Sequence, residues 1–156
     1  MKTFLFIAAL AASFAATALA HEFTVGTMTV DHPIVREMPP GGQVAAGYFT
    51  IINKGPADRL IAIETESAKS AELHRSVVED GIAKMRPLTG GLDVPANATV
   101  RVGDDGTHVM FVEPHWPLTE TSAADATLVF EKAGRVEVVF TVEKNAAPEA
   151  STHAGH

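Results

Sequence analysis

Residues 71–88, AELHRSVVEDGIAKMRPL, contain two runs of alternating apolar and polar residues on either side of Glu79-Asp80-Gly81. Alternation with a period of two is typical of β-strands, and Asp-Gly between two such runs predicts a tight hairpin. The length of the loop decides where the side chains point. A two-residue loop at Asp80-Gly81 places His74 diagonal to Met85 on one face, and a four-residue loop places them directly opposite each other. A three-residue loop would separate them onto opposite faces unless a bulge intervened.

A further strand is predicted over residues 107–112, THVMFV, which carries His108 and Met110. Residues i and i+2 of a strand point to the same face, so these two side chains should project side by side. Together with His74 and Met85 they form a set of two imidazoles and two thioethers that could converge. A set of these donors without a carboxylate suits Cu(I) better than zinc, calcium or magnesium. The pattern therefore predicts a Cu(I) site at His74, Met85, His108 and Met110.

Each of these residues taken alone has a simpler explanation. Met85 could fill a gap in the core, and either histidine could lie on the polar face of its strand. The joint occurrence of four compatible ligands at convergent positions favours the metal site. The alternate positions carry apolar residues that should face the core, which would leave the ligands on the more exposed face; these residues are Leu73, Val77, Val109 and Phe111.

The spacing His-x10-Met followed by His-x-Met, together with GYFTIIN at residues 47–53 and AELH at residues 71–74, resembles the periplasmic PCu(A)C copper chaperones. The resemblance covers residues 24–142. The gap between Met85 and His108 has one residue more than the family signature, and we expect the turn at residues 102–106 to absorb it. The resemblance implies a cupredoxin-like Greek-key antiparallel β-barrel or sandwich. It also implies a Cu(I) chaperone that delivers copper to the CuA centre in cytochrome c oxidase assembly, or to another copper-assembly protein.

The remainder of the chain is consistent with an all-β fold. About eight or nine short strands, separated by turns rich in Gly, Pro and Asn, predict an antiparallel sandwich or barrel. No long helical period and no internal repeat is present in the sequence. The expected strands cover residues 23–30, 44–53, 59–65, 71–78, 82–88, 99–102, 107–112, 126–131 and 135–142.

Residues 1–20 have the pattern of a signal peptide. Lys2 precedes an apolar run, and Ala18-Leu19-Ala20 forms a small-x-small cleavage site. The run is short and rich in alanine, which argues against the alternative of an uncleaved membrane anchor. We expect cleavage after Ala20 to release a monomeric periplasmic protein without stable membrane insertion. Its β domain should cover residues 21–144, and a flexible tail that contains histidine should follow at residues 145–156.

Composition excludes several classes of function. The formal net charge is −7 at pH 7 with His neutral, which argues against a nucleic-acid partner. The chain has no cysteine, and this excludes blue-copper centres, thiolate zinc sites, iron–sulfur clusters and cysteine nucleophiles. Serine triad contexts, phosphate loops and His-Glu-x-x-His motifs are also absent from the sequence, so we expect the protein not to be an enzyme.

The termini suggest a second, weaker copper site. Cleavage after Ala20 would give His21 a free α-amine beside its imidazole, which is a bidentate chelator for Cu(II), and His153 and His156 could add nitrogen ligands. The simpler explanation is that cleavage happens to fall before a histidine. Three other functions stay open: a copper storage or scavenging protein, an oxygenase that binds copper through its N-terminal His, and a metal-free β-sandwich interaction module.

Overall fold

The computed structural model describes residues 22–145, which form eleven β-strands and no helix. The long strands alternate buried and exposed side chains along most of their length, as expected for strands that cover a core with one face. The strands are β1 (Glu22–Val25), β2 (Met28–Arg36), β3 (Val44–Asn53), β4 (Asp58–Glu64), β5 (Ala68–Glu79), β6 (Ile82–Pro87), β7 (Leu92–Val94), β8 (Thr99–Val102), β9 (Thr107–Pro114), β10 (Ala123–Phe130) and β11 (Gly134–Glu143).

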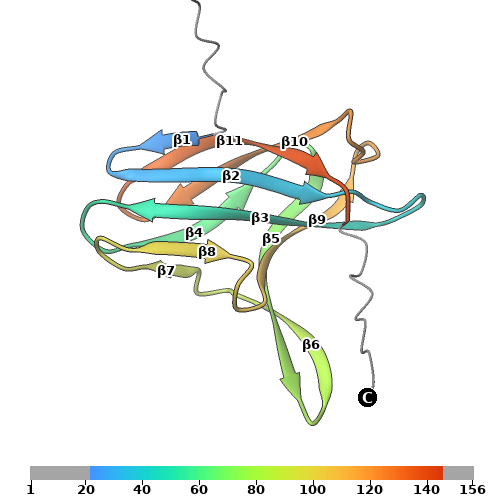
Figure 1. Cartoon of the computed structure of the whole chain (residues 1–156), viewed down its shortest axis with the longest axis horizontal. Helices are drawn as coiled ribbons and strands as arrows, with labels where there is room; N and C mark the ends of the chain where they lie inside the picture. The colour runs from blue at the N-terminus through green and yellow to red at the C-terminus, as the bar shows by residue number, and fades with distance from the viewer. Residues whose placement is uncertain (1–21, 146–156) are drawn as a thin grey trace, which may run out of the picture.

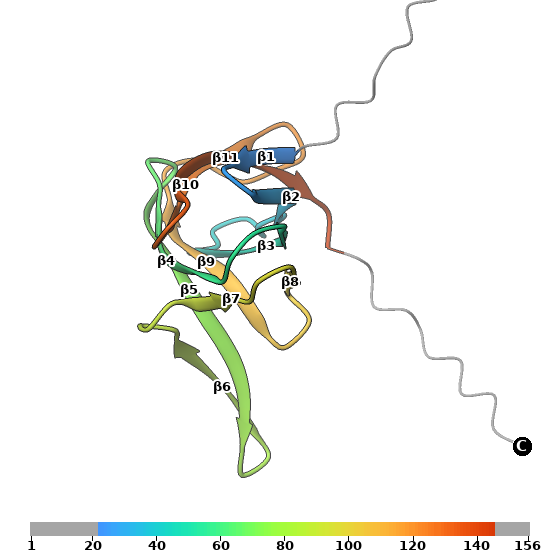
Figure 2. The same ribbon diagram turned by 90° about the vertical axis from the view of Figure 1, so that its left-hand side faces the viewer.

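The strands belong to one hydrogen-bonded sheet in the order β6-β5-β9-β3-β2-β11-β10-β4-β7, with β1 added to β2 and β8 added to β3. The sheet curls round on itself, as an end-on view shows (Figure 2), and its inner face carries the buried apolar side chains of the core. The β5–β6 hairpin extends away from this body as an arm (Figure 1). The predicted all-β fold is confirmed. Of the strand pairs among the described residues, β2 with β11 is the only parallel one.

Aromatic and branched side chains fill the interior between the two halves of the curled sheet. Among them, Phe140 makes edge-to-face contacts with Phe49 and Phe111, at ring-centroid distances of 5.9 and 5.2 Å. All three rings are buried, and each contributes about 1.5–3 kcal/mol through removal of its surface from water. Phe111 lies on β9, so this cluster fixes the strand that also carries His108 and Met110.

The structure has more strands than predicted. The first expected strand is two strands, β1 and β2, joined by a turn at Gly26 and Thr27, and β7 lies in a segment expected to be a loop. His32 lies within β2 at an irregularity of the β2–β3 ladder and has a positive φ of 49°. The irregularity accommodates Pro33, which has no N–H to donate to a ladder.

Several sequence-based predictions concern residues outside the described part of the chain. The signal peptide at residues 1–20, His21, and the tail with His153 and His156 all belong to this group. Residues 22–145 contain no helix of the length and apolar character that a membrane crossing requires.

Candidate metal centre

The hairpin that carries Met85 has the two-residue loop that was one of the three alternatives. Glu79 pairs with Ile82, and Asp80 and Gly81 have φ values of 54° and 75°. Positive φ at both loop residues is typical of a type I′ turn, which Asp-Gly favours. With this loop Met85 pairs with Ser76, two residues beyond His74, and is therefore diagonal to His74 on the same face.

The ladder between β5 and β9 places the two histidines next to each other. His74 pairs directly with His108, and Glu72 pairs directly with Met110. Directly paired residues project to the same face of a sheet, so all four predicted ligands share one face. The two imidazole rings have centroids 6.2 Å apart. With a metal–nitrogen bond of about 2.0 Å and about 1.2 Å from nitrogen to ring centre, two imidazoles on one ion have centroids about 5.2 Å apart at a tetrahedral angle and about 6.4 Å apart in a linear arrangement, and the observed separation lies between these values.

Met85 lies farther from the others along the ladder. Met85 lies on β6, two strands away from Met110 on β9, and is offset from it by four residues in the direction of the strands. In a flat sheet this offset corresponds to about 16 Å between Cα atoms. The structure therefore brings His74, His108 and Met110 together on neighbouring strands, whereas Met85 can join them only if the arm curls over that face.

Each imidazole has one nitrogen in a hydrogen bond and one that is free. In His108, Nδ1 lies 3.0 Å from the carbonyl oxygen of Gly106. In His74, Nε2 lies 3.0 Å from Oε2 of Glu72, and Nδ1 is buried without a hydrogen-bond partner. Leaving a buried polar atom unpaired costs about 1–3 kcal/mol. A bound metal ion would satisfy this nitrogen, so the residues present fit a copper ion.

Glu72 is the carboxylate nearest to the predicted ligands along the ladder, and the sequence interpretation overlooked it. Its Oε1 accepts a hydrogen bond of 3.0 Å from the hydroxyl of Ser70. The hydrogen bond from His74, together with that from Ser70, holds the pKa of the Glu72 carboxyl below its usual range. The signal available in the sequence was the spacing Glu-x-His on one strand, which places both side chains on one face.

A tight turn before β9 orients His108. Gly106 has a φ of 78°, and its carbonyl oxygen accepts a hydrogen bond of 2.9 Å from the backbone N–H of Ser76. Arg75 pairs with Asp105 at 2.8 Å and donates from Nε to the hydroxyl of Thr107 at 3.0 Å. These contacts tie the turn to β5 and hold His108 opposite His74.

The predicted division between a core face and an exposed ligand face is correct only in part. Leu73, Val109 and Phe111 are buried as expected, whereas Val77, on the arm, is only half-buried. The ligand face is not uniformly exposed, because His108 is only 7% exposed and the side chain of His74 only 13%. Met85, in contrast, is 58% exposed. The two histidines of the site are thus largely buried, whereas the thioether of Met85 is open to solvent.

The two faces of the arm differ in charge. Glu79 forms ion pairs of 2.9 Å with both Lys84 and Arg86, and all three lie on the face that points away from the ligands. The ligand face of the arm carries Val78, which is 74% exposed, and Met85. An exposed, uncharged surface therefore adjoins the histidine pair.

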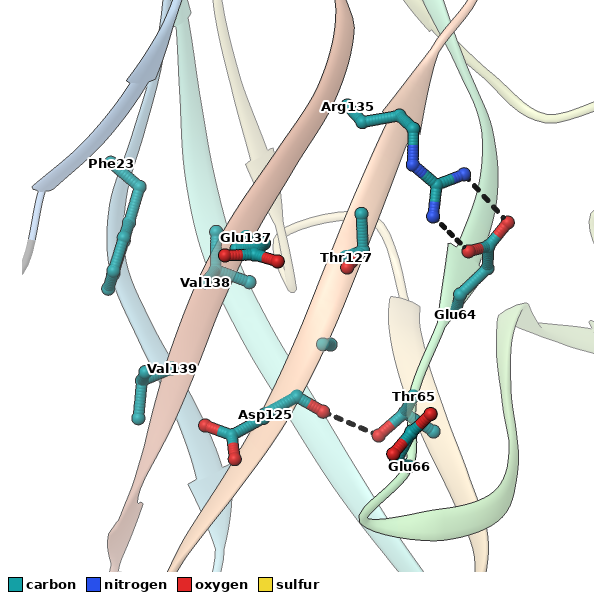
Figure 3. Close-up of a pocket in the computed structure, with 11 residues that line it drawn as sticks. Phe23, Glu64, Thr65, Glu66, Asp125, Thr127, Arg135, Glu137, Val138 and Val139 are labelled. Carbon is teal, nitrogen blue, oxygen red and sulfur yellow. Dashed lines mark hydrogen bonds and ion pairs between the residues drawn. The ribbon is translucent and has the colours of Figure 1, made fainter.

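Two further observations limit where a metal could bind within residues 22–145. No group of three or more His, Asp or Glu side chains there could hold a metal ion, so a site at the histidine pair depends on the thioethers. A separate cavity of about 720 Å³ lies over β4, β10 and β11 and contains none of the predicted ligands (Figure 3). Glu64 and Arg135 form an ion pair at its edge.

Comparison with known proteins places this chain in a defined family. The family model described as "Putative lipoprotein LpqE-like" matches residues 28–142, and the chain belongs to this family. A relative named "Putative lipoprotein Lxx21020" from Leifsonia xyli subsp. xyli is 26% identical over 104 residues, which cover 66% of this chain. The match covers 63% of that relative, less than two thirds of its length.

Solved structures of PCuAC domains share the fold, and the resemblance inferred from the sequence is confirmed. The copper-bound PCuAC domain from PmoF2 is 28% identical, with a TM-score of 0.66, over 80% of this chain and 99% of that domain. The apo PCuAC domain from PmoF1 is 27% identical, with a TM-score of 0.67, over 80% and 100%. The CuI form of DR1885 from Deinococcus radiodurans is 28% identical, with a TM-score of 0.57, over 84% and 86%.

Proposed function

We propose that this chain is an exported copper chaperone that carries one Cu(I) ion as cargo, bound by His74, Met85, His108 and Met110. One observation carries the proposal: Nδ1 of His74 is buried without a hydrogen-bond partner, in a residue that pairs directly with His108 across the ladder. Two thioethers lie on the same face of the sheet. Two similar structures have names that specify copper, one as copper-bound and one as CuI, which supports copper as the cargo.

The two thioethers and two imidazoles are the reason why we propose Cu(I) and not Cu(II) as the bound ion. Soft thioether ligands stabilise Cu(I) relative to Cu(II), and imidazole supplies the borderline donors that complete the set. Thioethers have no proton to lose, so the contribution of Met85 and Met110 should persist under mild acidity. The imidazoles must be neutral to bind, so their contribution weakens as the pH falls.

The exposed thioether suits a protein that passes its metal on. A ligand set of Met and His binds Cu(I) less tightly than an acceptor that offers thiolates, so copper can move by ligand exchange. Met85 and the uncharged face of the arm are the accessible entry for such an acceptor. We propose the apo CuA centre of cytochrome c oxidase, or another copper-assembly protein, as the acceptor. The carrier would act as a monomer and without enzymatic activity.

Export is part of the same proposal. The name of the matching family includes the word lipoprotein, and residues 1–20 have the signal pattern. We propose cleavage after Ala20 and a periplasmic location. The intact mass of the exported protein tests this, because a mass that retains residues 1–20 would contradict cleavage.

The termini are proposed to bind Cu(II) separately and more weakly, through His21, His153 and His156. The reason is the amine–imidazole pair that cleavage would create. Deletion of residues 146–156 combined with acetylation of the amine should reduce Cu(II) uptake and leave Cu(I) uptake unchanged. Equal loss of both would contradict an independent terminal site.

The chaperone function is tested by transfer. The Cu(I)-loaded protein is mixed with a reduced apo CuA domain, the two are separated, and copper is measured in each. We expect copper to move to the acceptor, and an acceptor with alkylated thiols serves as the control that should receive none. Copper that stays with this chain against an excess of reduced acceptor would make storage or scavenging the correct function.

A further inference from the structure

The two histidines of the site use different nitrogens for their hydrogen bonds. A carbonyl oxygen can only accept, so Nδ1 of His108, 3.0 Å from the carbonyl of Gly106, carries the hydrogen. The neutral ring then has its lone pair on Nε2. His74 is the reverse case. Its Nε2 faces a carboxylate oxygen of Glu72 at 3.0 Å and carries the hydrogen, which leaves the lone pair on Nδ1.

Glu72 is itself held in place. One of its oxygens accepts from Nε2 of His74 and the other accepts from the hydroxyl of Ser70 at 3.0 Å. Ser70, Glu72 and His74 alternate along β5 and therefore lie on one face, where Glu72 is paired with Met110 of β9. The Glu72 side chain is 50% exposed, so its carboxylate approaches the ring from the solvent side while Nδ1 of His74 stays buried.

We propose that Glu72, braced by Ser70, is a positioning residue that makes His74 bind copper through Nδ1, whereas His108 binds through Nε2. This rests on the proposed Cu(I) function. A carboxylate that accepts a hydrogen bond from the far nitrogen of a metal-binding histidine fixes the tautomer and ring orientation and raises the basicity of the ligating nitrogen. The site is therefore built from two histidines that present different atoms.

The test uses nitrogen NMR of the histidine rings, because Cu(I) is diamagnetic. Spectra of the apo and Cu(I)-loaded protein are compared for the parent, Glu72→Gln and Glu72→Ala. Gln retains an oxygen that can accept from Nε2–H, and Ala removes it. Glu113→Ala is the control, because Glu113 pairs with Lys69 in the same two strands and contacts none of the four ligands.

In the parent, apo His74 should be the Nε2–H tautomer, and Cu(I) should shift its Nδ1 signal. We expect Glu72→Gln to keep both signatures. Glu72→Ala should give a mixture of tautomers at His74 and lower the Cu(I) affinity about 10–100-fold, with the His108 tautomer unchanged. Glu113→Ala should match the parent. If the alanine variant does not fold, the tautomer of the parent and the retained signal in Glu72→Gln still decide the assignment.

Two results would overturn the proposal in distinguishable ways. A parent protein that binds no Cu(I) would remove the proposed function and this assignment with it. A parent that binds Cu(I) through Nε2 of His74, or a Glu72→Ala variant with the parental tautomer and affinity, would overturn only the role of Glu72.

Discussion

Gly106 should not tolerate a side chain, and this tests how the turn before β9 holds the site together. Its φ of 78° is a left-handed conformation, which costs a non-glycine residue about 1–2 kcal/mol. A Cβ at this position would also lie 2.8 Å from the carbonyl oxygen of Ser76. The turn would have to move from β5, which weakens the hydrogen bond from Ser76 N–H to Gly106 and costs about 0.5–1.5 kcal/mol more.

The expected loss of unfolding free energy for Gly106→Ala is thus about 1.5–3.5 kcal/mol. Gly81→Ala is the matched control, because Gly81 has a similar φ of 75° but open space around its Cα. It should lose only about 1–2 kcal/mol. Urea denaturation of the apo proteins measures both losses. If Gly106→Ala is no less stable than Gly81→Ala, the close packing of the turn against β5 is wrong.

Two other predictions concern the arm and the acid stability of the fold. Val78→Asp, on the ligand face of the arm, should slow Cu(I) transfer to the acceptor at least several-fold without a change in Cu(I) affinity. Ile82→Asp, on the other face, should leave the transfer rate unchanged. Equal transfer rates for the two variants in a stopped-flow assay would contradict an approach of the acceptor over the ligand face. For Asp58, burial opposes the charged form, but hydrogen bonds from three backbone N–H groups, including those of Lys132 and Ala133, keep its pKa below the usual range. Because the pKa of Asp58 is lower in the folded state, its carboxylate stabilises the fold fully at a pH above its unfolded-state pKa of about 3.9. This stabilisation is lost as the pH falls through the folded-state pKa. Asp58→Asn should lower the free energy of unfolding by about 1–3 kcal/mol at pH 7 and by progressively less below pH of about 4. Denaturation at a series of pH values measures this loss. A loss that does not change with pH would mean that the charge of Asp58 does not stabilise the fold.

The hairpin could be predicted from the sequence, because Asp-Gly lies between two alternating runs, but its register stayed open between three loop lengths until the structure showed Glu79 paired with Ile82. Once the loop has two residues, parity alone places Met85 on the same face as His74. The contact between His74 and His108 could not be predicted this way. It depends on the register between β5 and β9, two strands separated by β6, β7 and β8 in the chain, and local patterns do not encode it.

The burial of His108 and the role of Glu72 also required the structure. His108 follows a turn at which β3 changes its partner from β9 to β8, so its surroundings come from segments distant in the sequence. Glu72 could be placed on the ligand face from its spacing to His74. Whether its carboxylate reaches Nε2 depends on side-chain rotamers and on the hydroxyl of Ser70, which a pattern of polar and apolar residues does not specify.

The most direct test of the central claim is a Cu(I) competition titration of the parent, Met85→Leu and Met110→Leu. Leucine conserves the side-chain volume and removes the sulfur, so stability should change by less than about 1.5 kcal/mol. The parent should bind one Cu(I), and both variants should fold and bind it more weakly. If both variants bind Cu(I) as tightly as the parent, the thioethers are not ligands and this face of the sheet is not the copper site.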